Sequence, residues 1–163
     1  MRKDTLAKFH ETWDNLIRML TRLTLLVLVA LWSLPIAVID ARTRQIPNGA
    51  IGLGGIVALA WAIGTQTLTA HLLGAAALAA IGLVGYLTGG FGAGDVKYLM
   101  VLGLWFGFWR GGLALGCAAA GGALWGLTTW LVTGDRPTTM AFGPWLAVGT
   151  ILAAMVSTAD LGV

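Results

Sequence analysis

Two aspartates are the residues of this apolar chain best suited to chemistry. Asp40 follows an apolar run that begins near residue 23, and Asp95 follows the glycine-rich stretch Gly89–Gly94. A carboxylate beside a membrane-length apolar segment is costly to keep, so its presence suggests a function. Two carboxyl groups facing one water share a proton, and one then acts as base while the other acts as acid. Such a pair could hydrolyse a peptide bond.

The composition indicates the class of protein that must position these groups. Of the 163 residues, 58% are hydrophobic and only 10% are charged, which predicts an integral membrane protein. The net charge of +3 is small and spread along the chain, which argues against nucleic-acid binding. Cys117, His10 and His71 have no partners at ligand spacing, so we expect no metal and no cofactor.

The apolar segments fall at about 23–39, 50–64, 68–88, 96–109, 111–133 and 141–159. They predict an all-α, polytopic transmembrane helix bundle of about six spans, with residues 23–163 as the transmembrane domain. The fourth and fifth segments could form a tight helical hairpin or one interrupted helix, and four or five spans are the alternatives. Glycines at 103, 107 and 111 would line one helix face and allow close packing.

Residues 1–22 form a separate, more polar opening segment. Its apolar residues recur at helical spacing: Leu6, Phe9, Trp13, Leu16, Ile17 and Leu20. This pattern predicts an N-terminal amphipathic helix at the membrane surface, with partner binding as the alternative.

Span counting indicates which acids can meet. Two spans separate Asp40 from Asp95, so both are expected on the same membrane face. Asp135 falls on that face as well, and Asp160 falls on the other. Asp135 lies in Thr133-Gly-Asp-Arg-Pro137, which is typical of a solvated turn, so the pair Asp40 and Asp95 is favoured.

The residues around the two aspartates suit a substrate site. Glycines such as Gly94 let a peptide backbone come close to Asp95. Pro47 can begin a helix, and Asn48 is a candidate cap for it. A plain surface ion pair between Asp95 and Lys97 is the alternative that needs no catalysis.

At these residues the chain resembles the type IV prepilin peptidases, polytopic membrane aspartic proteases with a Gly-x-Gly-Asp signature. Three stretches carry the resemblance: Asp40 with Ile46-Pro-Asn48, Gly92-Ala-Gly-Asp-Val-Lys97, and Met140-Ala-Phe-Gly-Pro-Trp-Leu-Ala-Val-Gly149. The resemblance implies an endopeptidase that removes the short basic leader from prepilin-like proteins, with Asp40 and Asp95 as the catalytic pair. The residues it implies as site-shaping or near the substrate are Gly92, Gly94, Lys97, Pro47, Asn48, Phe142, Gly143 and Pro144.

The resemblance is to the compact, peptidase-only form associated with tight-adherence (Flp-type) pili. Larger members carry an N-terminal domain, often with two Cys-x-x-Cys pairs that hold zinc, and also N-methylate the mature pilin. Those four cysteines are missing here. The resemblance therefore implies no methyltransferase activity and no zinc.

The resemblance also implies the bacterial inner membrane, with the catalytic face in the cytoplasm. That orientation places Arg42, Arg44, Lys97 and Arg136 inside, as the positive-inside rule prefers. It places Arg2, Lys3, Lys8, Arg18, Arg22 and Arg110 outside, so charge counting alone favours the reverse. Two other functions fit the residues: a small transporter in which the aspartates bind a proton or cation, and a non-catalytic membrane scaffold.

Overall fold

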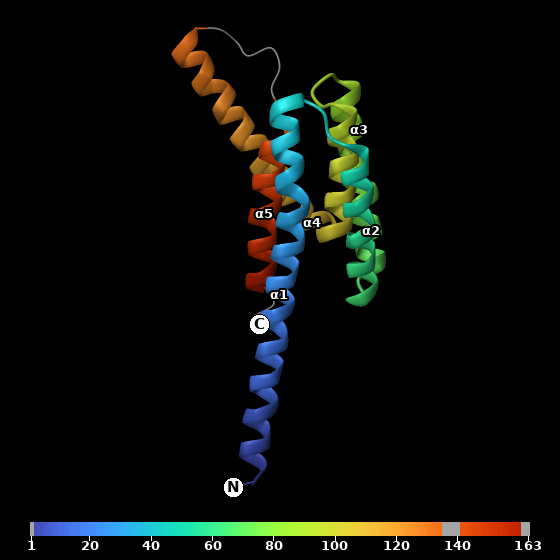
Figure 1. The fold of residues 1–163 in the computed structure, drawn as a ribbon, viewed down its shortest axis with the longest axis vertical. Coiled ribbons are helices and arrows are strands. Elements are labelled where there is room, and N and C mark those ends of the chain that lie inside the picture. Colours follow the sequence, from blue (N-terminus) through green and yellow to red (C-terminus); the bar gives the residue numbers. More distant parts are fainter. Residues whose placement is uncertain (1, 135–140, 161–163) are drawn as a thin grey trace.

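Helices make up the fold in the computed structural model, which describes residues 2–134 and 141–160. They are α1 (Arg2–Thr43), α2 (Asn48–Gly64), α3 (Leu68–Leu87), α4 (Ala93–Thr133) and α5 (Gly143–Asp160) (Figure 1). The described ranges contain no strand. The predicted all-α bundle is confirmed, and its helices follow the apolar segments of the sequence.

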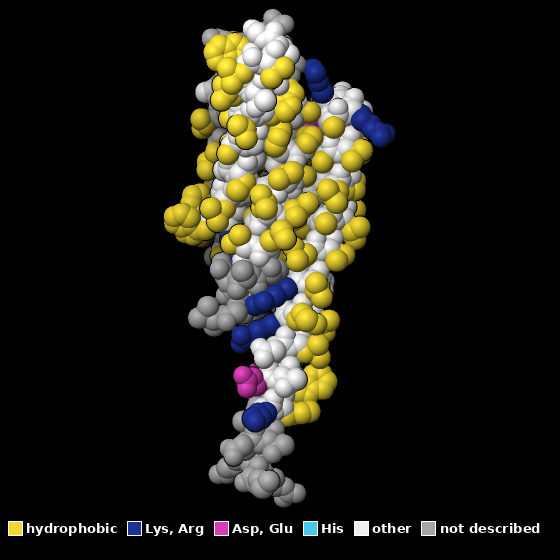
Figure 2. Space-filling view, turned by 90° about the vertical axis from the view of Figure 1, so that its left-hand side faces the viewer, with side chains coloured by type: hydrophobic (Ala, Val, Ile, Leu, Met, Phe, Trp, Pro, Cys, Tyr) yellow, Lys and Arg dark blue, Asp and Glu magenta, His cyan; other side chains and the backbone are white. Residues whose placement is uncertain are grey.

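The helix α1 is continuous from the polar opening through the first apolar segment. Its N-terminal part extends beyond the other helices in Figure 1. Figure 2 shows charged side chains on one side of this extension and apolar ones on the other. The exposed apolar residues there include Phe9, Trp13, Ile17 and Leu20. The extension is therefore amphipathic, as its residue spacing predicts, but it continues directly into the first apolar segment.

Among the described residues, three helical stretches are long and apolar enough to cross a membrane: Lys8–Thr43, Leu68–Leu87 and Ala93–Thr133. Asn48–Gly64 and Gly143–Val156 are shorter apolar helices. Large hydrophobic side chains are exposed over most of the bundle (Figure 2), as expected of a protein whose outer surface contacts lipid. Within the described ranges, five helices cover the six predicted segments, because the fourth and fifth segments both lie in α4.

The helix α4 is interrupted at Gly107, which has φ 69° and ψ −169°. A positive φ of this size is costly for residues with a Cβ, so glycine suits the break. The two segments of α4 run in different directions on either side of it (Figure 1). His71 of α3 donates from Nδ1 to the carbonyl of Leu104 at 2.6 Å, just before the break. A Cβ on Gly111 would lie 3.8 Å from Cα of Gly103, so the second segment folds back beside the first. Of the two alternatives for this region, the tight helical hairpin describes the structure better.

The glycines predicted to line one face of 103–111 bring α4 against α3 at backbone distance. A Cβ built on Gly103 would lie 2.5 Å from the backbone of Gly74 and Ala75, and one on Gly74 would lie 2.5 Å from Gly107. No side chain can turn away from such a contact, because the neighbouring atoms are backbone. Close approach of small residues replaces the hydrophobic effect as a source of helix association in lipid.

Replacing Gly103 with valine should therefore destabilise the bundle. Forcing extra methyl groups into a packed interior costs about 1–3 kcal/mol, and more where backbone must move. We expect a clearly lower midpoint of thermal unfolding in detergent. Gly112→Val is the matched control, because a Cβ at Gly112 meets nothing within 4 Å. Equal midpoints for the two variants would contradict the packing role of Gly103.

A buried aromatic and hydroxyl layer joins the helices that carry the two aspartates. Trp32 of α1 stacks on Tyr98 of α4 with ring centroids 4.6 Å apart. The Tyr98 hydroxyl lies 3.1 Å from Oγ1 of Thr150 in α5, and both residues are fully buried. Since Tyr98 follows Asp95 by about one helical turn, this layer links α1, α4 and α5 close to Asp95.

Candidate active site

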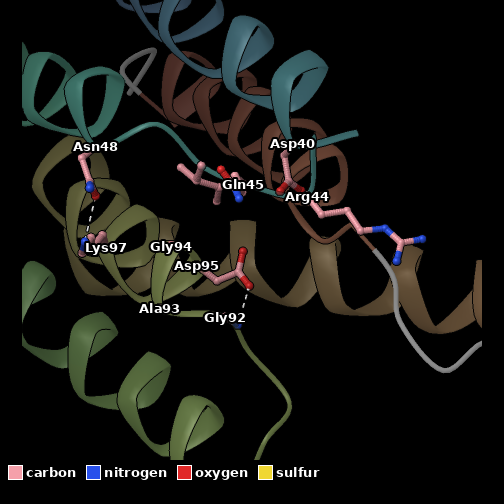
Figure 3. Close-up of a pocket in the computed structure, with 10 residues that line it drawn as sticks. Asp40, Arg44, Gln45, Asn48, Gly92, Ala93, Gly94, Asp95 and Lys97 are labelled. Carbon is pink, nitrogen blue, oxygen red and sulfur yellow. Dashed lines mark hydrogen bonds between the residues drawn. The ribbon is translucent and has the colours of Figure 1, made fainter. Parts of the chain in front are cut away.

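One open cavity of about 310 Å³ contains both aspartates. It lies between the end of α1, the loop that follows it and the start of α4. The residues that line it are Asp40, Arg44, Gln45, Ile46, Asn48, Gly92, Ala93, Gly94, Asp95 and Lys97 (Figure 3). The structure therefore brings Asp40 and Asp95 to the same end of the bundle, as span counting predicted.

Asp40 occupies the end of α1 and is only 5% exposed. Its Oδ2 accepts the backbone N–H of Gly143 at 2.8 Å in a buried contact. Gly143 begins α5, so its N–H is one of the helix-terminal donors with no partner inside the helix. A Cβ on Gly143 would lie 2.7–2.9 Å from Asp40 side-chain atoms. Glycine at this position therefore lets the start of α5 hold the Asp40 carboxyl group.

Asp95 lies in the first turn of α4 and is partly exposed to the cavity. Its Oδ2 accepts the backbone N–H of Gly92 at 2.9 Å (Figure 3). An acid at this helix position satisfies a free N–H and interacts favourably with the positive end of the helix dipole. The bond fixes the carboxyl group while leaving it on the wall of the cavity.

Lys97 and Asn48 form a contact across the cavity that the sequence did not suggest. Lys97 donates from Nζ to Oδ1 of Asn48 at 2.8 Å (Figure 3). Asn48 was expected to cap α2, but the cap position is Pro47, with no side-chain bond to the helix. The alternative of an Asp95–Lys97 ion pair is also wrong, since among the described residues Lys97 bonds to Asn48 instead.

Gly92 and Gly94 both line the cavity, as their predicted site-shaping role requires. A Cβ on Gly94 would lie 3.0 Å from Cβ of Ile46. The glycine therefore lets the loop after α1 approach the start of α4. From the sequence we expected Gly94 to admit a substrate backbone, and its contact with Ile46 was not predicted.

The remaining predicted residues lie outside the lining of the cavity. Pro47 precedes α2, and Pro144 lies in the first turn of α5. Phe142 stacks on Phe91 with ring centroids 5.2 Å apart, which joins the loop before α5 to the loop before α4. Asp135 lies outside the described residues. Asp160 ends α5, at the far end of that helix from Gly143.

Arg44 and Gln45 line the cavity and were not predicted as site residues. Arg44 has φ 54°, and this left-handed turn ends α1 and directs the chain into the loop. Its guanidinium extends away from Asp95 in Figure 3. Their sequence positions could have indicated both residues, because the short link between Asp40 and Pro47 must lie at the same end of the bundle as Asp40.

Comparison with known proteins identifies the family. A model of the type IV leader peptidase family matches residues 27–163. The chain belongs to the type IV leader peptidase family. The matched range contains Asp40 and Asp95, which line the cavity, and Gly143, whose backbone N–H bonds to Asp40.

A relative from the same group is similar over a shorter stretch. The prepilin leader peptidase/N-methyltransferase of Escherichia coli (strain K12) is 38% identical over 63 residues. The stretch is 39% of this chain and 28% of the relative, so the alignment spans less than a third of that protein. No solved structure matches the chain.

Proposed function

We propose that the protein is a membrane-embedded aspartic endopeptidase that removes the leader peptide from prepilin-like proteins. The observation that carries the proposal is the meeting of Asp40 and Asp95 in one open cavity, in a chain of the type IV leader peptidase family. The acids come from different helices, and each has one oxygen held by a backbone N–H. This arrangement suits chemistry that needs two fixed carboxyl groups.

In the proposed reaction, a water lies between the two carboxyl groups. The ionised one takes a proton from the water as its oxygen attacks the peptide carbonyl. The protonated one donates its proton to the developing oxyanion. When the C–N bond breaks, the first carboxyl group gives the proton taken from water to the leaving amine, and the second takes a proton back from the hydroxyl of the intermediate. The bonds from Gly143 and Gly92 occupy Oδ2 of Asp40 and Asp95 respectively, which leaves each Oδ1 for water and substrate.

The proposed setting is the bacterial inner membrane, with the cavity on the cytoplasmic side. A prepilin-like substrate would present an extended leader junction to the cavity, because a peptide bond within a helix is shielded. Residues 23–163 would form the peptidase domain, and residues 1–22 an amphipathic extension at the membrane surface. The family match over 27–163 supports this division.

The test is cleavage of a prepilin-like substrate in membranes that contain the full chain. Mass spectrometry of the products should place the cut at the leader junction, and membranes without the chain should leave the substrate intact. The two-carboxylate mechanism needs no metal, so chelation with EDTA should not change the rate. Cleavage that stops on chelation, or that falls elsewhere in the substrate, would contradict the proposal.

Gly94→Val should lose cleavage while the protein remains inserted. The larger side chain would push Ile46 and its loop away from the start of α4, and this loop lines the cavity. The double variant Gly94→Val with Ile46→Ala makes room for the added side chain and should recover part of the activity. Full cleavage by a well-folded Gly94→Val protein would refute the role of this glycine.

A further inference from the structure

A groove between α1 and α2 runs along the apolar part of the bundle. It consists of two adjoining hollows, of about 190 Å³ and 420 Å³, which share Leu28 of α1 and Val57 of α2. The smaller hollow reaches Leu53, and the larger one reaches Thr65, just after the end of α2. Along α2 the groove therefore covers about 18 Å, at ~1.5 Å per residue.

One end of this groove lies near the cavity that contains the two aspartates. The helix α2 begins at Asn48, which lines that cavity, and Leu53 at the near end of the groove follows soon after on the same helix. The separation along the helix is about 8 Å, at ~1.5 Å per residue. An extended chain crosses that distance with about two or three residues. A helix in the groove could therefore be joined by a short extended segment to a peptide bond in the cavity.

The wall that α1 contributes leads to the same place. Leu31, Pro35 and Ile39 recur every fourth residue, so they lie on one face of the helix. All three are exposed, and Leu31 lines the groove. Ile39 directly precedes Asp40, which lines the cavity. This exposed apolar stripe of α1 therefore continues from the groove to the first aspartate.

Trp32 forms a fixed floor for the groove. Its indole N–H donates to the carbonyl of Ala50 at 2.9 Å, and a Cβ on Gly54 would overlap the indole ring. Trp32 is only 8% exposed, whereas the groove residues Leu31 of α1 and Leu53 of α2 are 69% and 64% exposed. The groove is therefore shaped by the packing of α1 against α2, and its outer side is open.

The lining of the groove suits an apolar helix. None of the residues that line it is charged. The hydroxyls of Thr21 and Thr65, at its far end, each donate at 2.9 Å to a carbonyl one turn earlier in the chain. Ala60 is exposed and a Cβ on Gly64 would meet nothing within 4 Å, so another helix can approach closely. A polar occupant would lack partners there, whereas a membrane helix satisfies its own backbone.

We propose that this groove binds the apolar helix of the substrate, the helix that follows the leader junction. The inference rests on the proposed peptidase function. Lipid chains also suit an apolar surface, but a lipid in the groove would have no relation to the cavity. The position of the groove favours the substrate, because a helix bound there carries the segment next to it toward Asp40 and Asp95. The groove would select substrates with an apolar helix and place the cut at a fixed distance from it.

Disulfide crosslinking in membranes tests where the substrate lies. The full chain carries Cys117→Ser, which removes its one cysteine, and Asp95→Asn, which prevents turnover. Leu53→Cys is then combined with a prepilin-like substrate that has single cysteines along its apolar segment. A disulfide needs Cα atoms about 4.4–6.8 Å apart, so we expect crosslinks at every third or fourth substrate position. Val148→Cys is the matched control and should give none, because Val148 is 51% exposed on α5, on the other side of α1 from α2 (Figure 1).

A cleavage assay tests whether the groove contributes to the reaction. Ala60→Trp places a large side chain at an exposed position of the groove wall. It should lower kcat/KM for the membrane-embedded substrate by about tenfold or more, the size expected when a packed contact is overfilled. Cleavage of a short soluble peptide with the leader junction but without the apolar helix should be unchanged. Val148→Trp is the control and should cleave both substrates at the wild-type rate.

Two results would overturn the groove as the binding site of the substrate helix. They are equal crosslinking by Leu53→Cys and Val148→Cys, and wild-type cleavage of the membrane-embedded substrate by Ala60→Trp. If Ala60→Trp loses cleavage of both substrates, its fold is disturbed and the crosslinking result decides. Absence of cleavage by the wild type would count against the peptidase function instead, because the crosslinks need no turnover and report on the groove alone.

Discussion

Asp40→Asn and Asp95→Asn should each lower the rate of leader cleavage by about 10²–10⁴-fold, the usual contribution of a positioned acid or base. An amide can neither take a proton from water nor share one with the opposing carboxyl group. Losing either acid therefore removes the pair, and the double variant should be little worse than each single one. The measurement is in-membrane cleavage of a prepilin-like substrate, normalised to the amount of inserted protein.

Asparagine is the right replacement because it keeps the structural bonds of both aspartates. Its side-chain oxygen can still accept the N–H of Gly143 or of Gly92, so the starts of α5 and α4 keep their partners. Asp135→Asn is the control and should cleave normally. Retained cleavage in either Asp40→Asn or Asp95→Asn, at normal membrane levels, would break the two-carboxylate mechanism and return the transporter and scaffold hypotheses to consideration.

Gly143→Ala should lower cleavage by about 10²-fold through misplacement of Asp40. Its Cβ would lie 2.7–2.9 Å from Oδ2, Cβ and Cγ of Asp40, which is too close for atoms that are not bonded. Asp40 is packed against the start of α5, so relief of this clash must displace its carboxyl group or the start of α5. A shift of about 1 Å in a catalytic group can cost 10²-fold in rate. Cleavage kinetics should show the loss mainly in kcat, because the leader-binding surface remains.

Gly49→Ala is the matched control for this variant. Gly49 lies near the same end of the bundle, beside Asn48, and a Cβ there meets nothing within 4 Å. Its cleavage rate should stay close to that of the wild type. Thermal unfolding of Gly143→Ala should remain cooperative, which separates a displaced carboxyl group from an unfolded protein. Normal cleavage by Gly143→Ala would show that the bond from α5 does not position Asp40 for the reaction.

Hydrophobic patterns and span counting were enough to predict the helices and the end of the bundle at which the two aspartates lie. The apolar runs determine where the helices lie, because an apolar segment of this length is stable in lipid only as a helix. Counting two spans between Asp40 and Asp95 places them at one end of the bundle, whichever way the bundle is oriented. The glycine spacing at 103 and 107 likewise predicts a close contact, since small residues on one face permit it.

Only the tertiary structure decided how these elements meet. The bond between Gly143 and Asp40 joins residues 103 positions apart, and no local pattern specifies such a contact. The same holds for Lys97, which bonds to Asn48 rather than to the nearby Asp95. The break at Gly107 also depends on what packs against it. Periodicity indicates which face of a helix is apolar, whereas the partner of each polar atom is set by the packing of all the helices together.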